Sequence, residues 1–441
     1  MCTEELSGRS SPDMSLTTPS PMDLERIRSQ FPALSICDEG RTRVYLDNPA
    51  GTQVPIRVLD RMREYLVSAN ANCGGAFRTS VVTDALLEES RQAAADLLNA
   101  ESGDQIVFGP NMTTLTITLA HTLAHEMQPG DEIVVTRLDH DANVAPWLRI
   151  AEERQVKIRW LDFNPETGIL DTDSLEPLLN RKTRLVAIGY ASNLLGTINP
   201  VKRIIHMAHA VDALVFVDAV HYAPHGPIDV QDLNADFLVC SPYKFFGPHQ
   251  GVLWGRPELL KRLRAYRVRP AGSVSPGKWE TGTQSHESIA GTLGAVEYLA
   301  GVGAEFGQAY SGERSDVRGR RLHLHCGMRV IQDYERQLSE HLIGGMLKIP
   351  GLKIRGIKDR DQFGKRVPTV SFTHEEDSPE RIARRLAEHN VYVWHGHSYA
   401  VEAVERMGLT EGGGVVRVGP VHYNSTEEID VFLSVLANRT Q

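Results

Sequence analysis

The stretch ADFLVCSPYKFFGPHQGVLWG, Ala235 to Gly255, places a single lysine, Lys244, between two apolar runs. Burying an ammonium group is costly unless the group is paired or neutralised. The first run, DFLVCS, has the composition of a buried strand, so Lys244 follows shortly after a strand end. Two interpretations are open: a lysine in a solvated loop, which is typical of this residue, or a lysine that forms a Schiff base.

Strand-like and helical segments alternate along the chain from about Leu24 to residue 300. The strand-like segments are DQIVFG, DEIVVTRLD, KIRWLDF, RLVAIGYAS, ALVFVDAV and DFLVCS, and segments such as VTDALLEESRQAAADLLNA have the period of amphipathic helices. Nearly continuous apolar strands separated by helices predict a parallel sheet covered on both faces. We therefore expect an α/β fold whose ligands lie outside the carboxyl ends of the strands.

The last third of the sequence has a different pattern. A long helical segment, SDVRGRRLHLHCGMRVIQDYERQLSEHLIGGML, precedes strand-like LKIRGI and TVSFTH and the helical segment PERIARRLAEHN. This order predicts a second, smaller α+β domain. We predict a disordered Ser-, Thr- and Pro-rich tail over residues 1–22, a segment over 23–44 that packs with the small domain, a large domain over 45–300 and the small domain over 301–441.

The composition argues against several classes of protein. The 441-residue chain has a formal net charge of -9, which disfavours a nucleic-acid-binding surface. Its apolar runs are too short for a membrane span, and its N-terminus lacks the pattern of a signal peptide, so we expect a cytoplasmic protein. Because the cysteines show neither CxxC nor a Cys/His ligand spacing, we predict reduced thiols and no metal site. They are Cys2, Cys37, Cys73, Cys240 and Cys326.

Polar side chains follow several of the predicted strands. In VFGPNMTTLTI, Asn111, Met112 and Thr113 lie between a strand and a helix. Backbone N–H groups and the helix dipole can hold a phosphate there, although Asn and Thr are also common helix caps. His140 follows another strand in RLDHDANVAPW, where a histidine serves either as a structural hydrogen-bonding group or as a functional one.

Asp218 ends the apolar run LVFVD, 26 residues before Lys244. A carboxylate in a buried position needs a cationic or N–H partner. One interpretation is a cap on the following turn. The other is an ion pair with a protonated pyridine nitrogen, which makes a pyridoxal ring an electron sink for carbanions. In the second interpretation Asp218 and Lys244 serve one cofactor from adjacent strand ends.

In combination, these motifs resemble the class V aminotransferase family, specifically its cysteine desulfurase-like branch of pyridoxal 5'-phosphate (PLP) enzymes. The resemblance extends from about Phe31, through FPAL and VYLDNPAGTQVP, to the C-terminus. It implies a fold-type I PLP enzyme: a large domain with a mostly parallel seven-stranded sheet between helices, and a smaller α+β C-terminal domain. It also implies that Lys244, in SPYKFFGPHQGVLWG, forms the Schiff base and moves a proton once substrate displaces it.

The resemblance assigns further residues to the cofactor. DEIVVTRLDHDANVAPW is similar to the segment whose histidine, here His140, stacks on the cofactor ring. In VFVDAVHYAPH, Asp218 would face the pyridine nitrogen, and His221 would stand where a Gln usually bonds O3'. Together with Lys244, His140 and Asp218 are the implied catalytic residues. The other implied contacts are Asn193 of YASNLLGTINP near O3' and the substrate, Ser241 and Tyr243 (usually His) on the phosphate, and Thr283 of WETGTQS on the phosphate of a neighbouring subunit.

An amino-acid substrate and a homodimer also follow from the resemblance. Arg417, in VVRVGPVHYNSTEEID, would bind the substrate α-carboxylate bidentately, beside Asn193. Because Thr283 would reach the phosphate of a neighbouring subunit, we predict a homodimer with shared active sites.

One feature of the family is missing. Cysteine desulfurases carry sulfur as a persulfide on a mobile Cys in an R-x-GHHCA loop. The matching stretch here, VYVWHGHSYA, has Tyr399 at the Cys position, Ser398 beside it and Trp394 in place of the Arg. A phenol or a hydroxyl cannot form a persulfide, so the usual sulfur transfer should fail. Four side chains either act as acid/base groups or substrate contacts, or have only a structural role; they are His395, His397, Tyr399 and His422. Cys73, in NANCGGAF, is a candidate for a displaced thiol.

Several functions remain open on the sequence alone. In the first, an external aldimine loses its Cα proton and the resulting carbanion leads to a lyase, epimerase or cyclase reaction. In the second, sulfur or selenium leaves a cysteine-like substrate without a persulfide on the protein. The third is a non-catalytic PLP-binding scaffold. Transamination is a weaker option because it must also release a keto acid and accept a second substrate, which nothing in the sequence tests.

Overall fold

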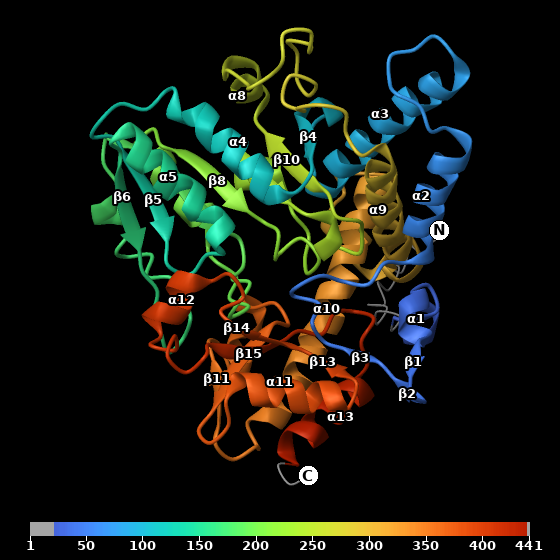
Figure 1. Cartoon of the computed structure of the whole chain (residues 1–441), viewed down its shortest axis with the longest axis vertical. Coiled ribbons are helices and arrows are strands. Elements are labelled where there is room, and N and C mark those ends of the chain that lie inside the picture. Colours follow the sequence, from blue (N-terminus) through green and yellow to red (C-terminus); the bar gives the residue numbers. More distant parts are fainter. Residues whose placement is uncertain (1–21, 439–441) are drawn as a thin grey trace, which may run out of the picture.

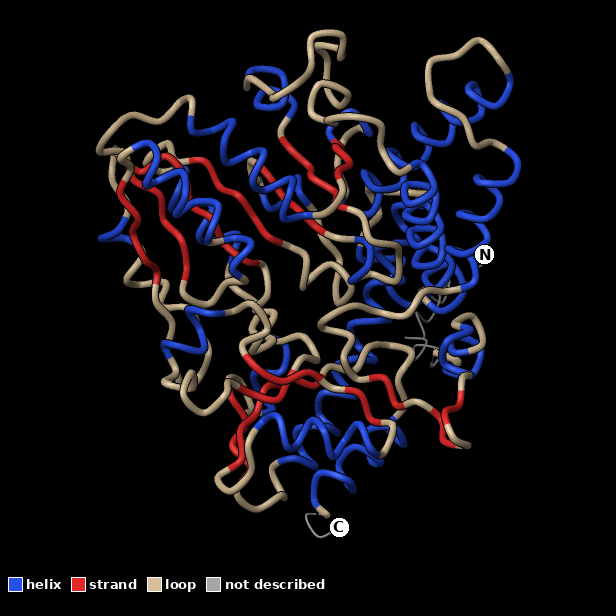
Figure 2. The backbone as a smooth tube through the Cα atoms, viewed as in Figure 1, coloured by secondary structure: helices blue, strands red, loops and turns tan. Residues whose placement is uncertain are grey.

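In the computed structural model, which describes residues 22–438, seven strands form one sheet between helices (Figures 1 and 2). All neighbouring strands are parallel except β10, which is antiparallel to β4 and β9. The predicted mostly parallel seven-stranded sheet is therefore confirmed. In the order β4-β10-β9-β8-β7-β5-β6, its strands are β4 (Ile106–Gly109), β10 (Gly251–Gly255), β9 (Phe237–Cys240), β8 (Leu214–Asp218), β7 (Thr183–Gly189), β5 (Glu132–Thr136) and β6 (Lys157–Leu161).

Both faces of this sheet are buried, which explains why its strands are nearly continuous apolar runs. Phe108 and Val134 pack into a core on one face with α3 and α9, whereas Val107 and Val135 pack on the other face with α4 and α5. Figure 1 shows α4 and α5 crossing in front of the strands. The helices of this part are α2 (Ile56–Ser68), α3 (Arg78–Leu98), α4 (Met112–Ala124), α5 (Ala145–Arg154), α6 (Val201–His209), α7 (Val230–Leu233), α8 (Pro257–Arg262) and α9 (His286–Phe306).

A smaller four-stranded sheet lies in the C-terminal part, at the bottom of Figure 1. Its order is β11-β12-β15-β14, and all its pairs are antiparallel. Phe372 of β12 and Phe432 of α13 pack edge-to-face in its core. The elements are β11 (Leu352–Arg355), β12 (Val370–His374), α11 (Pro379–Glu388), β13 (Val391–Tyr392), β14 (Trp394–Gly396), α12 (Val401–Arg406), β15 (Val415–Val418) and α13 (Thr426–Ala437).

The helix α10 (Arg320–Met346) connects the two parts. Leu324 and Ile331 belong to the core of the large sheet, whereas Leu338 and Leu342 belong to the core of the small sheet. A single helix thus contributes to both cores. The domain boundaries near residue 300 stay a prediction, and nearly all of the predicted tail over residues 1–22 lies outside the described residues.

The N-terminal segment contacts both parts. Its elements are α1 (Leu24–Arg28), β1 (Cys37–Asp38), β2 (Arg41–Thr42) and β3 (Val44–Tyr45). Phe31 lies in the core of the large sheet, while β3 pairs in parallel with β13 of the small part. Arg28 binds Glu428 at 2.9 Å. After β3 the chain runs back to the edge of the large sheet. There the backbone carbonyl of Pro49 accepts a hydrogen bond from Lys244.

Within residues 22–438, no helix is both long and apolar enough to cross a membrane. The same residues contain no group of three His, Cys, Asp or Glu side chains arranged to hold a metal ion.

Candidate active site

One cavity lies at the carboxyl edge of the large sheet. Because parallel strands end at the same edge, side chains far apart in the sequence meet there. Every predicted cofactor-binding residue except Thr283 contributes to its wall. The wall includes Asn111, Met112, Thr113, Asp139, His140, Asn193, Asp218, His221, Ser241, Tyr243 and Lys244.

Lys244 ends the short 3₁₀ turn Pro242–Lys244 that follows β9. Its Nζ donates to the backbone carbonyl of Pro49 and lies 4.9 Å from the centroid of the Tyr243 ring. Burial, and secondarily the charge of Arg417, lower the pKa of Lys244 to about 7, against the opposing effect of Asp47 and Asp218. A substantial fraction of this amine is therefore neutral near pH 7, which is the form that attacks an aldehyde.

Asp218, the last residue of β8, is the buried carboxylate of the same cavity. Its Oδ1 accepts a hydrogen bond from the N–H of Val220 at 2.9 Å. Burial raises the pKa of Asp218 to about 6, and no residue in the described part of the chain forms an ion pair with it. A protonated ring nitrogen would supply the missing cation, so the residues present fit a pyridoxal ring.

Asp139 is a second carboxylate of the cavity that we did not single out from the sequence. It accepts hydrogen bonds from the N–H of Gly189 at 2.9 Å and from the side chain of Asn143 at 2.8 Å. Burial raises the pKa of Asp139 to about 7, and the charge of Asp218 adds to the shift. Asp139 directly precedes His140, and this position was the sequence feature that could have identified it as a cavity residue.

His140 is held as a neutral imidazole. Its Nδ1 accepts a hydrogen bond from the N–H of Ala142 at 3.0 Å, so the proton of the neutral ring lies on Nε2. Burial, together with the charges of Lys244 and Arg417, lowers the pKa of His140 to about 4. The ring of Tyr399 stacks on it with centroids 5.4 Å apart.

Arg417 lies on β15, just beyond the cavity wall, and is buried. One of its nitrogens donates to the carbonyl of Asn193 at 3.1 Å, and another lies 3.6 Å from Asp47. Nε of Arg417 and Oδ1 of Asn193 are buried without a hydrogen-bond partner among the described residues. Buried polar atoms are normally satisfied, so this corner has free hydrogen-bonding capacity for a polar ligand.

Asp47 is a second residue that we did not assign from the sequence, although it lies in the quoted segment VYLDNPAGTQVP. Burial raises its pKa to about 6, while Arg417 and Lys244 oppose the shift. It thus places a carboxylate close enough to interact with the charges of both Arg417 and Lys244.

The loop that carries Tyr399 is pinned to the large sheet rather than free. The carbonyl of Ser398 accepts from Asn193 at 2.7 Å, and the carbonyl of Tyr399 accepts from the N–H of Asp141, also at 2.7 Å. Ser398 and Tyr399 have φ angles of 49° and 59°, in the left-handed region that non-glycine residues seldom adopt. The hydrogen bonds from Asn193 and Asp141 hold this unusual backbone.

Tyr399 lines a separate, mainly apolar pocket of about 400 Å³ with Ile117, Ala145 and His140.

His395 and His397 are exposed, and His397 accepts from the N–H of Tyr399 at 2.9 Å. His422 is buried and bonds Tyr298 at 2.6 Å, with its Nδ1 unpartnered among residues 22–438. Cys73 is exposed and is not part of the cavity wall.

Thr283 is exposed in the loop before α9 and does not reach the cavity of its own chain. The loop is anchored by Glu280, which binds Arg91 at 2.5 and 2.7 Å and accepts from the N–H of Phe108 at 2.8 Å. Both charged side chains are about nine-tenths buried. This anchor holds the start of the segment that carries Thr283.

We expect Glu280→Ala to lower the free energy of unfolding by about 3–5 kcal/mol, because it leaves the Arg91 guanidinium buried and unpaired. Urea denaturation followed by circular dichroism measures the change. Glu153→Ala, which removes the exposed partner of Arg149, is the control and should cost less than about 1 kcal/mol. Equal effects of the two substitutions would contradict the anchoring role.

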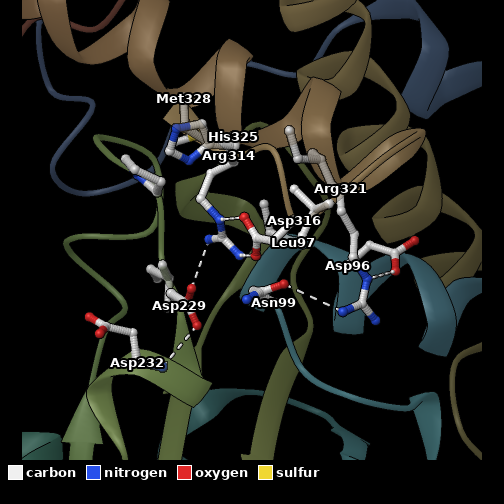
Figure 3. A pocket seen from close by; sticks show the side chains of 14 residues that line it. Asp96, Leu97, Asn99, Asp229, Asp232, Arg314, Asp316, Arg321, His325 and Met328 are labelled. Carbon is white, nitrogen blue, oxygen red and sulfur yellow. Dashed lines mark hydrogen bonds and ion pairs between the residues drawn. The ribbon is translucent and has the colours of Figure 1, made fainter. Parts of the chain in front are cut away.

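A polar cavity of about 440 Å³ lies away from this site, between the end of α3 and the start of α10 (Figure 3). Arg314 bridges Asp229 at 2.8 Å and Asp316 at 2.7 Å. Arg321 binds Asp96 at 2.9 Å. Because these charges neutralise one another within the wall, we assign no ligand to this cavity.

The comparisons with known proteins identify the family of the chain. The model of the family described as "Aminotransferase class-V" matches residues 44–323 and 320–432. The chain belongs to the class V aminotransferase family. It is a cysteine desulfurase-like PLP enzyme of that family, as the sequence motifs predicted.

Relatives match over nearly the whole chain. "Aminotransferase-like protein FGM3" of Gibberella zeae is 35% identical, covering 95% of this chain and 98% of its own. A "Probable cysteine desulfurase" of Streptomyces coelicolor is 32% identical, with 95% and 97% covered. Among solved structures, the cysteine desulfurase CsdA of Escherichia coli has a TM-score of 0.79 at 26% identity, with 95% and 98% covered. The predicted fold class is confirmed by this likeness.

Proposed function

We propose that the protein binds PLP through Lys244 and acts at the Cα of an amino-acid substrate, without a sulfur carrier of its own. The observation that carries this proposal is that one cavity wall holds both Lys244, whose pKa is lowered to about 7, and Asp218, a buried carboxylate with no ion-pair partner in the described part of the chain. When bound, PLP supplies an electron sink for negative charge at the substrate Cα.

Each residue of the cavity then has a separate task. Asp218 keeps a ring nitrogen charged, and the neutral His140 covers the ring. Lys244 removes or returns the proton at the substrate Cα, because its amine titrates near neutral pH. Asn111 caps α4 through Thr114 at 2.8 Å, next to free N–H groups that suit a phosphate, with Ser241 and Tyr243 across the cavity.

In this proposal Arg417 binds the substrate carboxylate, and Asn193 lies beside it in contact with the substrate. The support is the unpartnered Nε of Arg417, together with the bidentate geometry that guanidinium groups use for carboxylates. The unpartnered Oδ1 of Asn193 is an acceptor, so it suits a donor such as the substrate amino group. Asp47, 3.6 Å from Arg417, partly balances the charge of the guanidinium until substrate arrives. The mainly apolar pocket beside Tyr399 lies next to the same site.

The proposed reaction after proton removal is elimination, epimerisation or cyclisation rather than persulfide transfer. Tyr399 stands at the position of the family's carrier Cys, and its loop is held by backbone hydrogen bonds to Asn193 and Asp141. Cys240 is buried, and burial raises the pKa of its thiol to about 12, so it is a poor nucleophile. Release of sulfur directly from a cysteine-like substrate is the alternative, which the names of the desulfurase relatives favour.

A homodimer is part of this proposal. Thr283 is exposed near the anchored Glu280 and does not line the cavity of its own chain. The nearby surface of α2, α3 and the segment that joins them exposes large apolar side chains, among them Leu66, Val67, Phe77 and Val81. Such a surface suits contact with another copy.

The experiment that tests the function is a screen of amino acids with the PLP-loaded protein in deuterated water. We expect at least one amino acid to lose its Cα proton signal by NMR, and mass spectrometry to find no persulfide on the protein after incubation with cysteine. Free sulfide from cysteine would select the alternative. A colourless protein that exchanges no Cα proton would refute the proposal.

A further inference from the structure

His221 has one nitrogen bound and one left for the cavity. The residue is buried and lines the cavity wall. Its Nε2 lies 2.9 Å from the hydroxyl oxygen of Thr369. Its Nδ1 has no hydrogen-bond partner among the described residues. Whether Nδ1 is a donor or an acceptor depends on which nitrogen carries the proton.

The hydroxyl proton of Thr369 determines which ring nitrogen of His221 is protonated. Thr369 is fully buried, and Nε2 of His221 is the single hydrogen-bond partner of its hydroxyl within residues 22–438. If Nε2 carried the proton, the hydroxyl would accept from it and its own proton would be left without an acceptor, which buried groups avoid. Donation from Thr369 to Nε2 satisfies both residues. The proton of the neutral ring then lies on Nδ1.

The neutral state of His221 is supported by its surroundings. Burial lowers the pKa of His221 well below its ordinary value, and the charges of His225, Lys244 and Arg417 act in the same direction. No carboxylate hydrogen-bonds this imidazole in the described part of the chain. The ring is therefore a single-proton donor rather than a cation.

Thr369 is held firmly in the position that this donation needs. A nitrogen of the Arg366 guanidinium donates to its carbonyl at 2.5 Å. The backbone of Gly196 lies so close that a Cβ there would come within 2.3 Å of the same carbonyl. Val367 also donates to the carbonyl of Gly196 at 2.9 Å. Thr369 therefore reaches His221 from the segment before β12, across the junction with the large sheet.

We infer that Thr369 is a positioning residue that fixes His221 as the neutral Nδ1–H tautomer, so that His221 presents a hydrogen-bond donor to an oxygen of the bound cofactor. The inference rests on the proposed function for the identity of that oxygen. The tautomer itself is a property of the chain. A donor at this position stabilises negative charge on a ring oxygen, and it is present only while the small part of the molecule packs against the large one.

The test is an NMR measurement of histidine tautomers in the full-length protein labelled with ¹⁵N-histidine. Correlations between ring nitrogens and ring protons distinguish Nδ1–H from Nε2–H, and comparison with His221→Asn identifies the His221 signals. We expect Nδ1–H in the natural protein and in Thr369→Ser, which keeps the hydroxyl. In Thr369→Val, which has the same shape without a hydroxyl, we expect a shift toward Nε2–H. An Nε2–H tautomer in the natural protein would overturn the inference even if Thr369→Val fails to fold.

A second measurement uses the PLP-loaded protein. The pH at which the visible absorption band changes gives an apparent pKa. Without the Nδ1–H donor of His221, this pKa should rise by about one unit in Thr369→Val, and it should stay unchanged in Thr369→Ser. An unchanged band in a folded Thr369→Val protein would contradict the positioning role. The NMR result does not need bound cofactor, so failure of the proposed function and failure of this inference remain distinguishable.

Discussion

Lys244→Ala will abolish the visible absorption that borohydride bleaches and will slow Cα proton exchange by about 10³–10⁴-fold. The covalent link to PLP requires the Nζ of Lys244, and a positioned acid/base group contributes a factor of about 10²–10⁴ on its own. Absorption spectra before and after borohydride measure the first effect. Exchange of a substrate found in the amino-acid screen measures the second.

Two further variants make this prediction specific. Lys202→Ala removes a surface lysine that pairs with Asp232, and its spectrum and exchange rate should match those of the natural protein. Lys244→Arg keeps a cation in the cavity but offers no neutral amine, so it should be as inactive as Lys244→Ala. A borohydride-sensitive band in Lys244→Ala would show that another amine holds the cofactor.

The lowered pKa of Lys244 also predicts how the stability of the cofactor-free protein depends on pH. In the folded chain the pKa is about 7, whereas in the unfolded chain it is about 10.4. Between these values the unfolded state binds more protons, so the contribution of this group to the free energy of unfolding rises with pH across that window. Relative to Lys244→Ala, the natural protein should therefore gain stability as the pH rises above about 7.

The sequence was most informative where local pattern and topology determine position. Asp218 ends β8 and Lys244 follows β9, which lies beside it, so the parallel arrangement alone brings the two side chains to one edge. The long helical segment before LKIRGI was predicted over 315–347 and is α10 over Arg320–Met346. Its amphipathic pattern identified the helix, whereas its division between two cores depends on packing that one sequence does not reveal.

Residues recruited by long-range packing were harder to predict. Asp47 reaches Arg417 because β3 pairs with β13, a contact between segments nearly 350 residues apart. Thr369 meets His221 because Arg366 and Gly196 fix the junction between the two sheets. Neither contact follows from strand or helix periodicity. The role of Thr283 depends on a second chain, so it stays a prediction.

Arg417→Met should lower kcat/KM by about 10²–10³-fold, mainly through KM, without lowering the melting temperature. Loss of a bidentate guanidinium–carboxylate contact costs about 3–4 kcal/mol when the site is desolvated. If that contact is equally strong in the bound substrate and in the transition state, KM carries the loss. Steady-state kinetics with a substrate from the screen measures the change, and Arg355→Met, whose guanidinium binds Thr373 at 2.7 Å on the neighbouring strands, is the matched control.

The melting temperature should not fall because the buried guanidinium of Arg417 is poorly paired. Its guanidinium is buried, its Nε has no partner among the described residues, and its nearest carboxylate oxygen, on Asp47, lies 3.6 Å away. Replacing such a poorly paired cation by an apolar side chain of similar length is commonly neutral or stabilising. Asp47 then becomes protonated, because burial already raises its pKa to about 6 and Arg417 opposes that shift. A lower melting temperature with unchanged kcat/KM would identify Arg417 as a structural residue. A substrate-binding cation requires a lower kcat/KM with an undiminished melting temperature.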